Sequence, residues 1–500
     1  MTKYISIARI LTECFDCEFE DKNTKLSGVS SNSLDVKNGY LFCALSKNAI
    51  DYVPDAVSNG AIAVVSSVSE KGLNPFFYKK VFNKNILFIY HKDPKAVYHR
   101  ICKMLYPDQP KNLCAVTGTN GKTSVCDFFR QICILQGKSA ASIGTLGVIS
   151  QDAITQHGSL TSFDAIDLHR SLHGLKNKGV KYAALEASSH GILQKRLHSA
   201  RVDVAAFLNL SADHLDYHSD IESYFDAKSK LFTEVLSKQG TAVINTANPF
   251  GQRLANKLEK QTKIKVLKCL GSDAQIKILN WLPSKDGQAV RLQIFDKVID
   301  ARLGLFGKFQ SGNLIVAVAI AYAFKIDVCA LDYFKVKNAT GRMQQVFSGK
   351  DCRSVFVDYA HNPDGLQHAL QSLRYHFKDH KISLVFGCGG DRDKKKRPIM
   401  GQIAERYADK TIICDDNPRS EDPAKIRNDI LLGFKDPRKA TLIGCRGGAI
   451  KKALCNLDKN AILLIAGKGH EKAQHSKLCD LSFNDESFIK SVIANEFKDF

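Results

Sequence analysis

The feature that most constrains this chain is the segment TGTNGKTS at residues 117–124. An apolar strand is predicted just before it, over 113–116, and a helix just after it, over 123 to about 135. A glycine loop between a strand and a helix lets backbone N–H groups turn inward around phosphate oxygens, and the helix N-terminus adds the positive end of its dipole. The segment therefore predicts a phosphate-binding loop at the edge of a parallel α/β sheet.

The residues of this loop have separate predicted roles. Lys122 is expected to reach the β- and γ-phosphates of a nucleotide, and the Thr123 hydroxyl is expected to bind Mg²⁺. Only two residues separate Gly118 from Gly121, whereas the usual phosphate-binding loop has four residues between its glycines, so this loop is a shortened form. The predicted nucleotide contacts are Gly118, Thr119, Asn120, Gly121, Lys122, Thr123 and Ser124.

Apolar runs that alternate with helical stretches predict three α/β domains. Residues 1–92 should form a small α/β domain, which ends at a polar, proline-broken junction near 91–94. Residues 93–338 should form a mostly parallel sheet with helices on both faces, and 339–500 a second, Rossmann-like sheet. Strands are predicted at 60–65, in the later part of 83–90, and at 113–116, 180–185, 204–208, 354–357, 382–386, 411–414 and 461–465, with an apolar helix over 313 to about 324.

Charge leaves several classes of partner open. The chain has 71 Lys and Arg against 51 Asp and Glu, a net charge of +20, which suits nucleic acid, a membrane surface or a polyanionic small substrate. The basic residues are spread along the chain apart from one cluster at 394–397, without a basic tail or amphipathic helix. Part of this charge is expected to steer anionic substrates.

Hydropathy and cysteine usage indicate the compartment. No apolar stretch approaches the ~20 residues that span a bilayer, and the N-terminal segment lacks the apolar core of a signal peptide, so we expect a cytoplasmic chain. The 15 cysteines are odd in number and follow no framework spacing, which predicts reduced thiols. Cys14 and Cys17 form a C-x-x-C pair but lack the second ligand pair of a structural zinc site.

Two further strand ends carry groups that could hold a cation. Glu186 lies in LEASSH at 185–190, and His214 lies in NLSADHLDYH at 209–218. An acid at the carboxyl end of a parallel strand beside a phosphate loop can hold Mg²⁺, and His214 could complete its shell. Such a cation would offset charge in phosphoryl transfer. Alone, His190 or His214 is equally well explained as an ordinary hydrogen-bonded polar residue.

With these motifs in order, the chain resembles the Mur ligases, the ATP-dependent amide-bond-forming enzymes of peptidoglycan precursor synthesis. The resemblance runs from about Ser33 to Glu471 and rests on TGTNGKTS, LEASSHG, NLSADHLDYH, GRMQQV, VDYAHNPD, FGCGGDRDKKKRP, DDNPRSEDP and AGKGHE. It implies that 1–92 binds the uridine nucleotide, 93–338 binds ATP and 339–500 binds the incoming amino acid.

The resemblance also implies a reaction. ATP and Mg²⁺ would activate the D-glutamate γ-carboxylate of UDP-N-acetylmuramoyl-L-alanyl-D-glutamate as an acyl phosphate, which meso-diaminopimelate attacks to give the tripeptide, ADP and phosphate. The implied catalytic residues are Lys122, Glu186, His214 and Lys228; Thr123, Glu186, His214 and a carbamylated Lys228 would hold the metal. A monomer without nucleic-acid partners or membrane insertion is expected.

Further contacts carry over residue by residue. Asn313, Arg342, Asp358 and His361 match nucleotide contacts, and Ser33, Thr161, Ser162, Ser188, Gln194 and Arg196 match contacts to the muramoyl-peptide. The chain departs from the family pattern at Leu34 and Ala212, where arginine is usual, and at Phe163, where proline is usual.

The DNPR motif predicts the choice of amino acid. In the family this form goes with meso-diaminopimelate, which differs from lysine by one extra carboxylate. A guanidinium binds a carboxylate through two parallel hydrogen bonds and would repel the bare terminal ammonium of lysine. Arg392, Asn417 and Arg419 would bind carboxylates, and Glu471 with Gly467 would meet the distal ammonium. The implied amino-acid site is Arg392, Asp416, Asn417, Pro418, Arg419, Gly467 and Glu471.

Three alternatives stay open. A lysine-adding relative or a folylpolyglutamate synthase-like ligase is disfavoured by the DNPR and GKGHE segments. A non-catalytic P-loop protein that binds nucleic acid would need a basic face with aromatic side chains, which the single Trp281 and the dispersed charge do not favour. An inactive paralogue is supported only by Leu34, Phe163 and Ala212.

Overall fold

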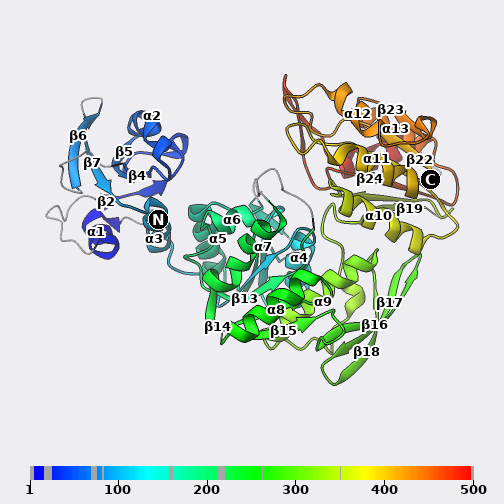
Figure 1. The fold of residues 1–500 in the computed structure, drawn as a ribbon, viewed down its shortest axis with the longest axis horizontal. Helices are drawn as coiled ribbons and strands as arrows, with labels where there is room; N and C mark the ends of the chain where they lie inside the picture. Colours follow the sequence, from blue (N-terminus) through cyan, green and yellow to red (C-terminus); the bar gives the residue numbers. More distant parts are fainter. Residues whose placement is uncertain are drawn as a thin grey trace.

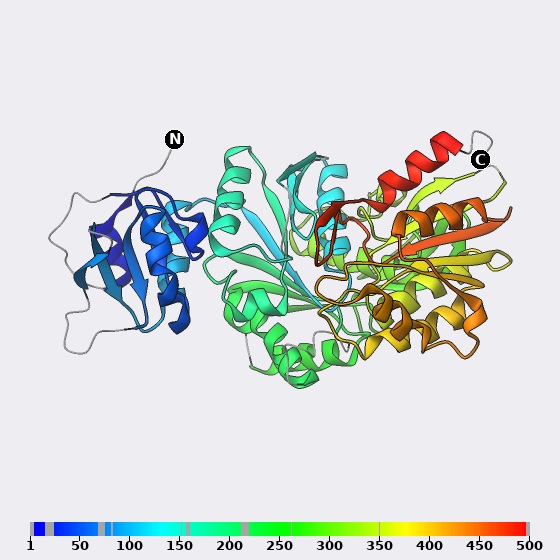
Figure 2. The same cartoon turned by 90° about the horizontal axis from the view of Figure 1, so that it is seen from above.

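The computed structural model describes residues 5–15, 25–68, 76–81, 84–151, 153–156, 161–211, 220–261, 263–349 and 351–496. These residues form three α/β units that follow one another along the chain, with the central unit lying between the other two (Figures 1 and 2). The three-domain α/β architecture expected from the sequence is confirmed. The predicted boundaries at 92/93 and 338/339 both fall between secondary-structure elements, and they stay predictions.

The N-terminal unit is a five-stranded sheet in the order β3-β4-β5-β7-β6. Its strands are β3 (Gly28–Ser30), β4 (Tyr40–Cys43), β5 (Ala61–Ser66) and β7 (Lys84–Tyr90), all parallel, with β6 (Phe76–Val81) antiparallel at the edge. The smaller elements are β1 (Ile5–Ser6), β2 (Lys25–Leu26), α1 (Ile7–Phe15), α2 (Val53–Ser58), η1 (Ser33–Asp35) and η2 (Lys47–Tyr52). The strands predicted at 60–65 and in 83–90 are confirmed as β5 and β7.

Helix α3 (Pro94–Leu105) begins at the predicted junction and joins the first two units. Proline suits its first position, and the Asp93 carboxylate caps the helix by accepting from the Ala96 N–H at 3.1 Å. The apolar face of α3 packs with the N-terminal sheet, and Ala165 and Ile166 of the central unit join the same cluster. Two polar contacts cross here as well: Tyr98 donates to Asp164, and Lys195 pairs with Asp93 at 3.2 Å.

The central unit is an eleven-stranded, mostly parallel sheet in the order β11-β10-β9-β12-β8-β13-β14-β15-β16-β17-β18. The parallel strands are β8 (Asn112–Thr117), β9 (Ala140–Gly144), β12 (Tyr182–Glu186), β13 (Val202–Phe207), β14 (Leu236–Asn245) and β15 (Lys265–Cys269). At one edge, β10 (Gly147–Ser150) and β11 (Ala153–Gln156) are antiparallel. At the other, β16 (Ile276–Ser284), β17 (Gly287–Ile294) and β18 (Lys297–Leu303) form an antiparallel extension, which joins β15 through one parallel pair, Cys269 with Ile276.

Helices cover both faces of this sheet because its strands are apolar on both sides. Successive residues of β8 alternate: Cys114 and Val116 face the core shared with α4 (Lys122–Leu135) and α9 (Lys308–Ala323), whereas Leu113 and Ala115 face the opposite core. The opposite face is covered by α5 (Ala165–Asn177), α7 (Ile221–Lys230) and α8 (Pro249–Gln261), with the short α6 (Ser189–Leu193) and the π-helical turn η3 (Leu231–Val235) nearby.

The predicted central strands and the helix after the phosphate loop are confirmed, and the differences have physical reasons. Helix α9 begins at Lys308, five residues before the predicted start. Its first turn was missed because Gln310 and Ser311 are polar and add nothing to the apolar run, although the fold buries them. The hairpins of β16–β18 escaped prediction because β16 and β18 are mostly half-buried or exposed, and β17 alternates its buried apolar residues Val290, Leu292 and Ile294 with polar ones, so none has a continuous apolar run.

The C-terminal unit is a six-stranded sheet in the order β19-β20-β24-β21-β22-β23. Its strands are β19 (Gln344–Ser348), β20 (Ser354–Asp358), β24 (Ala461–Ala466), β21 (Lys381–Phe386), β22 (Lys410–Ile413) and β23 (Ala440–Leu442). The edge strand β19 is antiparallel to β20, and the other neighbouring strands are parallel. Its helices are α10 (Pro363–His376), α11 (Lys396–Tyr407), α12 (Pro423–Leu431), α13 (Arg446–Cys455) and α14 (Asp485–Glu496). The remaining elements are η4 (Tyr333–Lys335), η5 (Pro437–Lys439) and the hairpin β25 (Ala473–His475) and β26 (Asp480–Ser482). The four predicted strands are confirmed.

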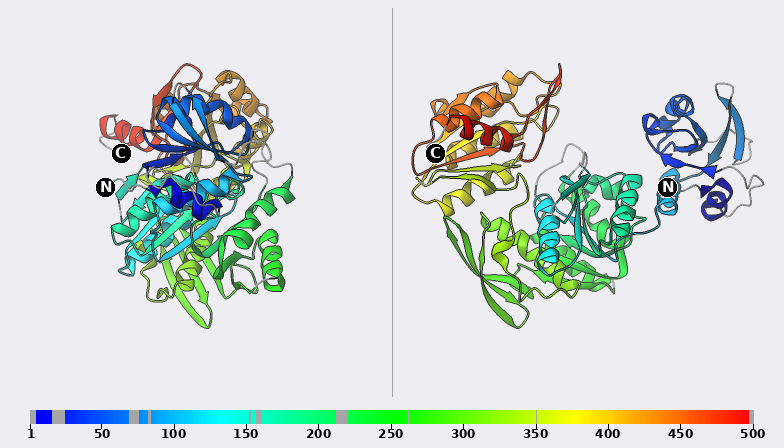
Figure 3. Two further views of the ribbon diagram at one scale, coloured as in Figure 1. Left: turned by 90° about the vertical axis from the view of Figure 1, so that its left-hand side faces the viewer. Right: turned by 180° about the vertical axis from the view of Figure 1, so that it is seen from behind.

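The antiparallel extension of the central sheet braces the C-terminal unit, and Figure 3 shows it reaching toward α10. The Trp281 ring packs edge-on against Tyr375 at 5.6 Å. His376 bridges the units: its Nε2 accepts from the Gly307 N–H at 2.9 Å, and its Nδ1 lies 2.8 Å from the Ser284 carbonyl. Since a carbonyl only accepts, Nδ1 carries the proton and the imidazole is neutral.

Two expectations about the chain as a whole can be compared with the described residues. Thirteen cysteines are described and all are free thiols, as predicted; the side chains of Cys14 and Cys17 are not among them. Across the described ranges, none of the helices combines the length and apolarity needed to cross a bilayer.

A buried ion pair fixes the last helix beneath the C-terminal sheet. Arg446 and Asp485 are both fully buried, and two parallel hydrogen bonds of 2.7 Å join them. Arg446 also donates to the Ala466 carbonyl at 3.0 Å, where β24 ends. The pair therefore holds α14 against the strand end that opens into the GKGHE loop.

We predict that Arg446→Met lowers the free energy of unfolding of the C-terminal unit by about 3–5 kcal/mol, because it leaves the Asp485 carboxylate buried without a partner. Denaturant unfolding followed by circular dichroism measures the change. Arg438→Met is the matched control: Arg438 is 90% exposed, and its loss should cost less than about 0.5 kcal/mol. Adding Asp485→Leu to Arg446→Met should restore most of the loss; equal stability of Arg446→Met and the parent would contradict the argument.

Candidate active site

The predicted phosphate loop joins β8 to α4. Gly121 is the N-cap of α4 and has φ +94°, a conformation that favours glycine. A Cβ there would lie 2.4 Å from Asn313 Oδ1, so the loop has no room for a side chain. The Lys122 ammonium folds over the loop and donates to the carbonyls of Gly118 at 2.8 Å and Thr119 at 2.9 Å. The strand–loop–helix arrangement that the sequence predicted is confirmed, and the nucleotide contacts of the loop stay predictions.

Asn209, which the sequence analysis did not single out, holds this loop in shape. Its Oδ1 accepts from the Asn120 N–H, and its Nδ2 donates to the Asn120 carbonyl, both at 3.0 Å. The Asn209 carbonyl also accepts from the Thr119 N–H at 3.1 Å. Asn209 follows β13, the strand beside β8, so its place at the start of NLSADH was a usable signal.

Glu186 lies beside the loop, at the carboxyl end of β12. Its carboxylate is 4% exposed and accepts from the Thr123 hydroxyl at 3.1 Å and from the Thr145 N–H and hydroxyl at 2.8 and 3.0 Å. Arg342, from the C-terminal side of the chain, donates to the same Thr123 hydroxyl at 3.1 Å. The hydroxyl and carboxylate oxygens that Mg²⁺ prefers are therefore adjacent and next to the phosphate loop.

Lys228 also reaches the phosphate loop. Its side chain is only 1% exposed, and Nζ donates to the Gly118 carbonyl at 3.0 Å and lies 4.3 Å from the centre of the Tyr224 ring. Lys122 and Lys228 thus share one acceptor. His214 and Ala212 lie outside the described residues, and the described ones contain no cluster of three histidine, cysteine or carboxylate side chains suited to a metal.

The remaining predicted nucleotide contacts surround the loop from α9 and the C-terminal unit. Asn313 is buried against Gly121 and donates to Gln310 at 3.0 Å. The Arg342 guanidinium stacks 4.2 Å from the centre of the Tyr359 ring. His361 Nδ1 lies 2.8 Å from the Tyr359 carbonyl, so Nδ1 carries the proton.

Asp358 holds the Arg342 turn in place. Its carboxylate accepts from the backbone N–H groups of Met343 at 2.6 Å and Ala360 at 2.8 Å. Burial raises the pKa of Asp358 to about 6, although Arg342 and these N–H groups oppose the rise. These contacts fix the backbone beside Arg342, so the structure gives Asp358 a supporting position.

A contact between domains completes the loop. Asn120 Nδ2 donates to Asp364 Oδ2 at 3.0 Å, and the Ser211 hydroxyl donates to the same oxygen at 3.4 Å. Asn362, which caps α10, donates to Asn120 Oδ1 at 3.4 Å. Asp364 was missed by sequence reasoning because its partners are 244 and 153 residues away in the chain.

Five of the predicted muramoyl-peptide residues gather beside Glu186. Ser162 donates to the Glu186 carbonyl at 3.0 Å and accepts from the Ser188 N–H at 2.9 Å, and Arg196 donates to the Ser162 carbonyl at 2.7 Å. Thr161, Ser162, Ser188, Gln194 and Arg196 all lie in or next to the loop after residue 160 and helix α6.

Two departures from the family pattern have a structural setting. Ser33 lies in η1 of the N-terminal unit, whereas the other predicted residues belong to the central and C-terminal units. Its neighbour Leu34 is 78% exposed, so this large apolar side chain stands in solvent where the family has arginine. Phe163 is buried in the core beside α5, where an aromatic ring fills the space.

The predicted amino-acid residues converge at the carboxyl edge of the C-terminal sheet. Asn417 Nδ2 donates to Glu471 Oε2 at 2.8 Å, and Arg419 donates to the Gly390 carbonyl at 2.8 Å. A Cβ on Gly389 would lie 2.9 Å from Arg419 Nη1 and 3.7 Å from Arg392 Cγ, so the two guanidinium-bearing chains flank the same glycine.

Asp416, Pro418 and Gly467 complete this group. Asp416 is buried, which raises the pKa of its carboxyl above the ordinary value. Gly467 has φ +111°, and a Cβ there would lie 2.5 Å from Asp416 Oδ2. A Cβ on Gly390 would clash with the Pro418 carbonyl oxygen, so the DNPR segment and the glycine-rich 387–390 segment pack backbone to backbone. Lys468, which sequence reasoning missed, is buried among these residues.

The loop that carries Arg342 touches the loop that carries Glu471. Gly341 has φ +68°, and a Cβ there would lie 2.3 Å from the His470 nitrogen. Gly469 has φ +53°, and a Cβ there would lie 2.8 Å from the Gly341 carbonyl. The Tyr359 ring packs between the Arg342 guanidinium and the His470 ring. The nucleotide loop and the amino-acid loop thus meet through their backbones.

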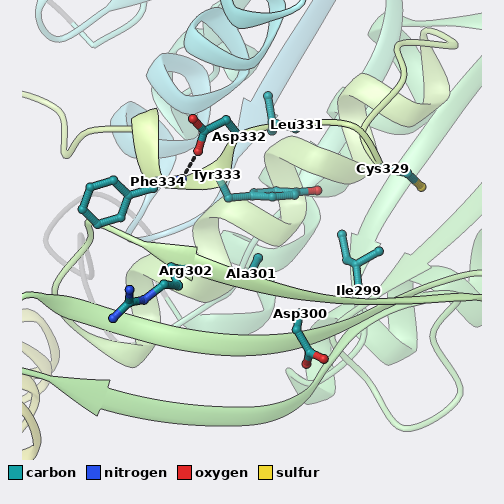
Figure 4. Close-up of a pocket in the computed structure, with 9 residues that line it drawn as sticks. All are labelled: Ile299, Asp300, Ala301, Arg302, Cys329, Leu331, Asp332, Tyr333 and Phe334. Carbon is teal, nitrogen blue, oxygen red and sulfur yellow. Dashed lines mark hydrogen bonds between the residues drawn. The ribbon is translucent and has the colours of Figure 1, made fainter.

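A cavity of about 430 Å³ lies elsewhere, between β18 and the segment that contains η4 (Figure 4). Its walls combine apolar and charged side chains, and Tyr333 reaches across it to donate to the Val328 carbonyl at 2.7 Å. None of the predicted site residues lines this cavity. The site therefore rests on the facing strand ends and not on this cavity.

A phosphate loop whose neighbours come from a second α/β sheet defines a class of nucleotide-dependent ligase, and comparisons with known proteins identify the family. Residues 116–321 match the family described as Mur ligase middle domain, and residues 341–469 match that described as Mur ligase, glutamate ligase domain. The chain belongs to the Mur ligase family, whose members are ATP-dependent, amide-forming ligases.

Full-length relatives agree with this assignment. The UDP-N-acetylmuramoyl-L-alanyl-D-glutamate--2,6-diaminopimelate ligase of Anaplasma marginale is 39% identical over 94% of this chain and 96% of its own length. The enzyme of the same name from Rickettsia bellii is 40% identical over 91% and 93%. A solved structure of a ligase with this name has a TM-score of 0.67 at 31% identity and covers 98% of this chain and 99% of that one. The ADP complex of MurF from Thermotoga maritima, at 17% identity, a TM-score of 0.61 and coverage of 93% and 96%, shares the fold.

We predict that Lys122→Ala weakens ATP binding roughly 10- to 100-fold, because it removes the ammonium placed over the phosphate loop and a charge-assisted hydrogen bond. Isothermal titration with a non-hydrolysable ATP analogue measures the affinity. Lys138→Ala, which removes an exposed lysine beyond the far end of α4, is the control and should bind like the parent. Unchanged affinity in Lys122→Ala would refute the assignment of the loop.

Proposed function

We propose that this chain joins meso-diaminopimelate to the γ-carboxylate of the D-glutamate in UDP-N-acetylmuramoyl-L-alanyl-D-glutamate and cleaves ATP to ADP and phosphate. The observation that carries the proposal is the presence of two opposite charges, Arg419 and Glu471, in the amino-acid site. Arg419 is fixed at Gly390 on one side, and Glu471 is fixed at Asn417 on the other. A diamino acid with a second carboxylate complements both, and the names of the full-length relatives agree.

The first chemical step is a transfer of phosphate to a carboxylate. An oxygen of the D-glutamate γ-carboxylate forms a bond to the γ-phosphorus, the bond from that phosphorus to the β–γ bridging oxygen breaks, and ADP leaves. Two anions must approach each other, so the cationic groups of Lys122 and Arg342 around the loop lower the barrier by electrostatic stabilisation.

The second step is aminolysis. The neutral amine of the amino acid attacks the acyl carbon, the tetrahedral intermediate expels phosphate, and the amine loses a proton as the amide forms. No side chain forms a covalent bond in either step. The two sheets supply the positions: the central one holds the nucleotide and the acyl donor, and the C-terminal one holds the amine, which is the acyl acceptor.

Mg²⁺ is part of the proposal. The adjacent oxygens of Thr123 and Glu186 fit a hard cation, and His214 with a carbamylated Lys228 would provide a second site. When bound, the metal would neutralise phosphate charge during the transfer. Carbamylation changes Lys228 from a cation into an anion, and its neighbours Gly118 and Tyr224 shield it from solvent.

A monomer in the cytoplasm completes the proposal. All of the proposed site residues come from one chain, so a second copy is not needed to assemble the site. The described cysteines are thiols, as expected for a reducing compartment.

We predict that phosphate release from ATP in the presence of UDP-N-acetylmuramoyl-L-alanyl-D-glutamate requires meso-diaminopimelate and does not occur with L-lysine. Arg419→Ala should raise the KM for diaminopimelate at least about tenfold, because it removes a charge-assisted contact to the second carboxylate. A coupled phosphate assay measures both. Arg438→Ala, an exposed arginine of the same unit, is the control. Release with lysine would keep a ligase and overturn this choice of substrate; release with neither would overturn the proposed function.

We predict that Lys228 carries a carbamate when bicarbonate is present in the solution. Growth or incubation with ¹³C-bicarbonate should give a carbamate carbon signal by NMR that is absent from Lys228→Ala and retained in Lys230→Ala, an exposed lysine on the same helix. Lys228→Ala should also lose ligation while it keeps its fold. A signal that survives in Lys228→Ala would place the carbamate elsewhere.

A further inference from the structure

The amino-acid site contains one charged side chain that takes no part in the two proposed chemical steps, Lys468. Its ammonium is fully buried, in the loop after β24. Nζ donates to Asn417 Oδ1 at 3.1 Å, to Glu471 Oε2 at 2.9 Å and to the Ala473 carbonyl at 2.6 Å. An ammonium has three N–H donors, and all three are used within the protein. Lys468 can therefore affect a bound amino acid only through the groups that it holds.

The first of these groups is the Asn417 amide, whose orientation Lys468 fixes. Oδ1 accepts from Lys468 Nζ and from the His475 N–H at 2.9 Å. The amide oxygen therefore faces the lysine, and the amide nitrogen faces Glu471, to which it donates at 2.8 Å. Of the two amide hydrogens, one is used by Glu471, and no described residue accepts the other.

The second group is the Glu471 carboxylate. Oε2 accepts from both Lys468 and Asn417, whereas no described residue donates to Oε1. Burial alone would raise the pKa of Glu471, but the Lys468 ammonium and the Asn417 amide outweigh it and hold the pKa below its ordinary value. One carboxylate oxygen and one amide hydrogen, both rigidly held, are thus available to a ligand.

We propose that Lys468 is a positioning residue for amino-acid selection, which presents Glu471 Oε1 and Asn417 Nδ2 to the distal ammonium and carboxylate of the incoming diamino acid. The proposal rests on the proposed function, because it assumes that these two residues bind the amino acid. Methionine is the closest apolar match in length and shape, so Lys468→Met removes the charge and the three hydrogen bonds with little change in volume.

The test is the kinetic profile of Lys468→Met. We expect the KM for meso-diaminopimelate to rise roughly 10- to 100-fold, as for lost hydrogen bonds to a charged group, while the KM values for ATP and for the UDP-linked substrate stay unchanged. Lys472→Met removes the same charge from an exposed position one residue after Glu471 and should leave all three values unchanged. An unchanged KM for diaminopimelate in a folded Lys468→Met, with an active parent, would overturn the proposal. A parent that is inactive with diaminopimelate would instead overturn the proposed function.

A double-variant cycle separates positioning from general stability. If Lys468 acts through Glu471, then adding Lys468→Met to Glu471→Gln should change the KM for diaminopimelate far less than it does in the parent. Equal losses in both backgrounds would overturn the proposal. Should Lys468→Met fail to fold because Glu471 is left without a counter-charge, the double variant removes both charges and is compared with Glu471→Gln alone. Failure of the double variant to fold would make Lys468 a structural residue and overturn the proposal.

Discussion

Parallel pairing of strands is the constraint on which both halves of the site depend. In the central sheet, Glu186 pairs with Val116 and Phe207 pairs with Thr117, so three strands end at one level and their loops meet there. In the C-terminal sheet, Asp358 pairs with Ala466 in the same way. Polar side chains brought together at carboxyl strand ends are a general property of open α/β sheets. A shift of one residue in either register would turn these side chains to the other face of the sheet.

The two sheets contribute to each other's loops. Arg342 donates to the Thr123 hydroxyl, and Asp364 accepts from Asn120, so the phosphate loop also needs contacts from residues beyond the central unit. The antiparallel extension with Trp281 supports the same interface from the other side. The reaction proposed for this chain needs an amine and an acyl phosphate at one point, and such cross-contacts are how two separately folded sheets can share that point.

Local signals were enough to predict the buried strands around the site and the strand–loop–helix arrangement of the phosphate loop. Apolar runs of four to six residues became β8, β12, β13 and the four C-terminal strands, because buried parallel strands need apolar side chains on both faces. The burial of charged groups could not be predicted this way. Arg397, in the basic cluster at 394–397, is fully buried between Glu421 and Asp429, although the cluster has the composition of a solvated surface.

The buried lysines show the same limit within the site. Lys228 sits in an ordinary helical stretch, and only the family resemblance drew attention to it; Lys468 was not predicted at all. Each has a hydrogen-bond partner from elsewhere in the fold: Gly118 is 110 residues from Lys228, and Asn417 is 51 residues from Lys468. The other two acceptors of Lys468, Glu471 and Ala473, are near it in the sequence. The distant partners depend on the tertiary structure, which composition and periodicity do not encode.

The backbone contact between Gly341 and Gly469 has a mechanical consequence. Side chains at a contact can change rotamer and absorb a displacement. Two backbone segments in direct contact, as at Gly341 and Gly469, cannot adjust in this way. A shift of the Arg342 turn must therefore be passed on to the loop that holds Glu471. We therefore expect the two loops to move together, so that Arg342 and Glu471, the groups proposed to contact the nucleotide and the amino acid, keep a fixed spacing when either loop shifts.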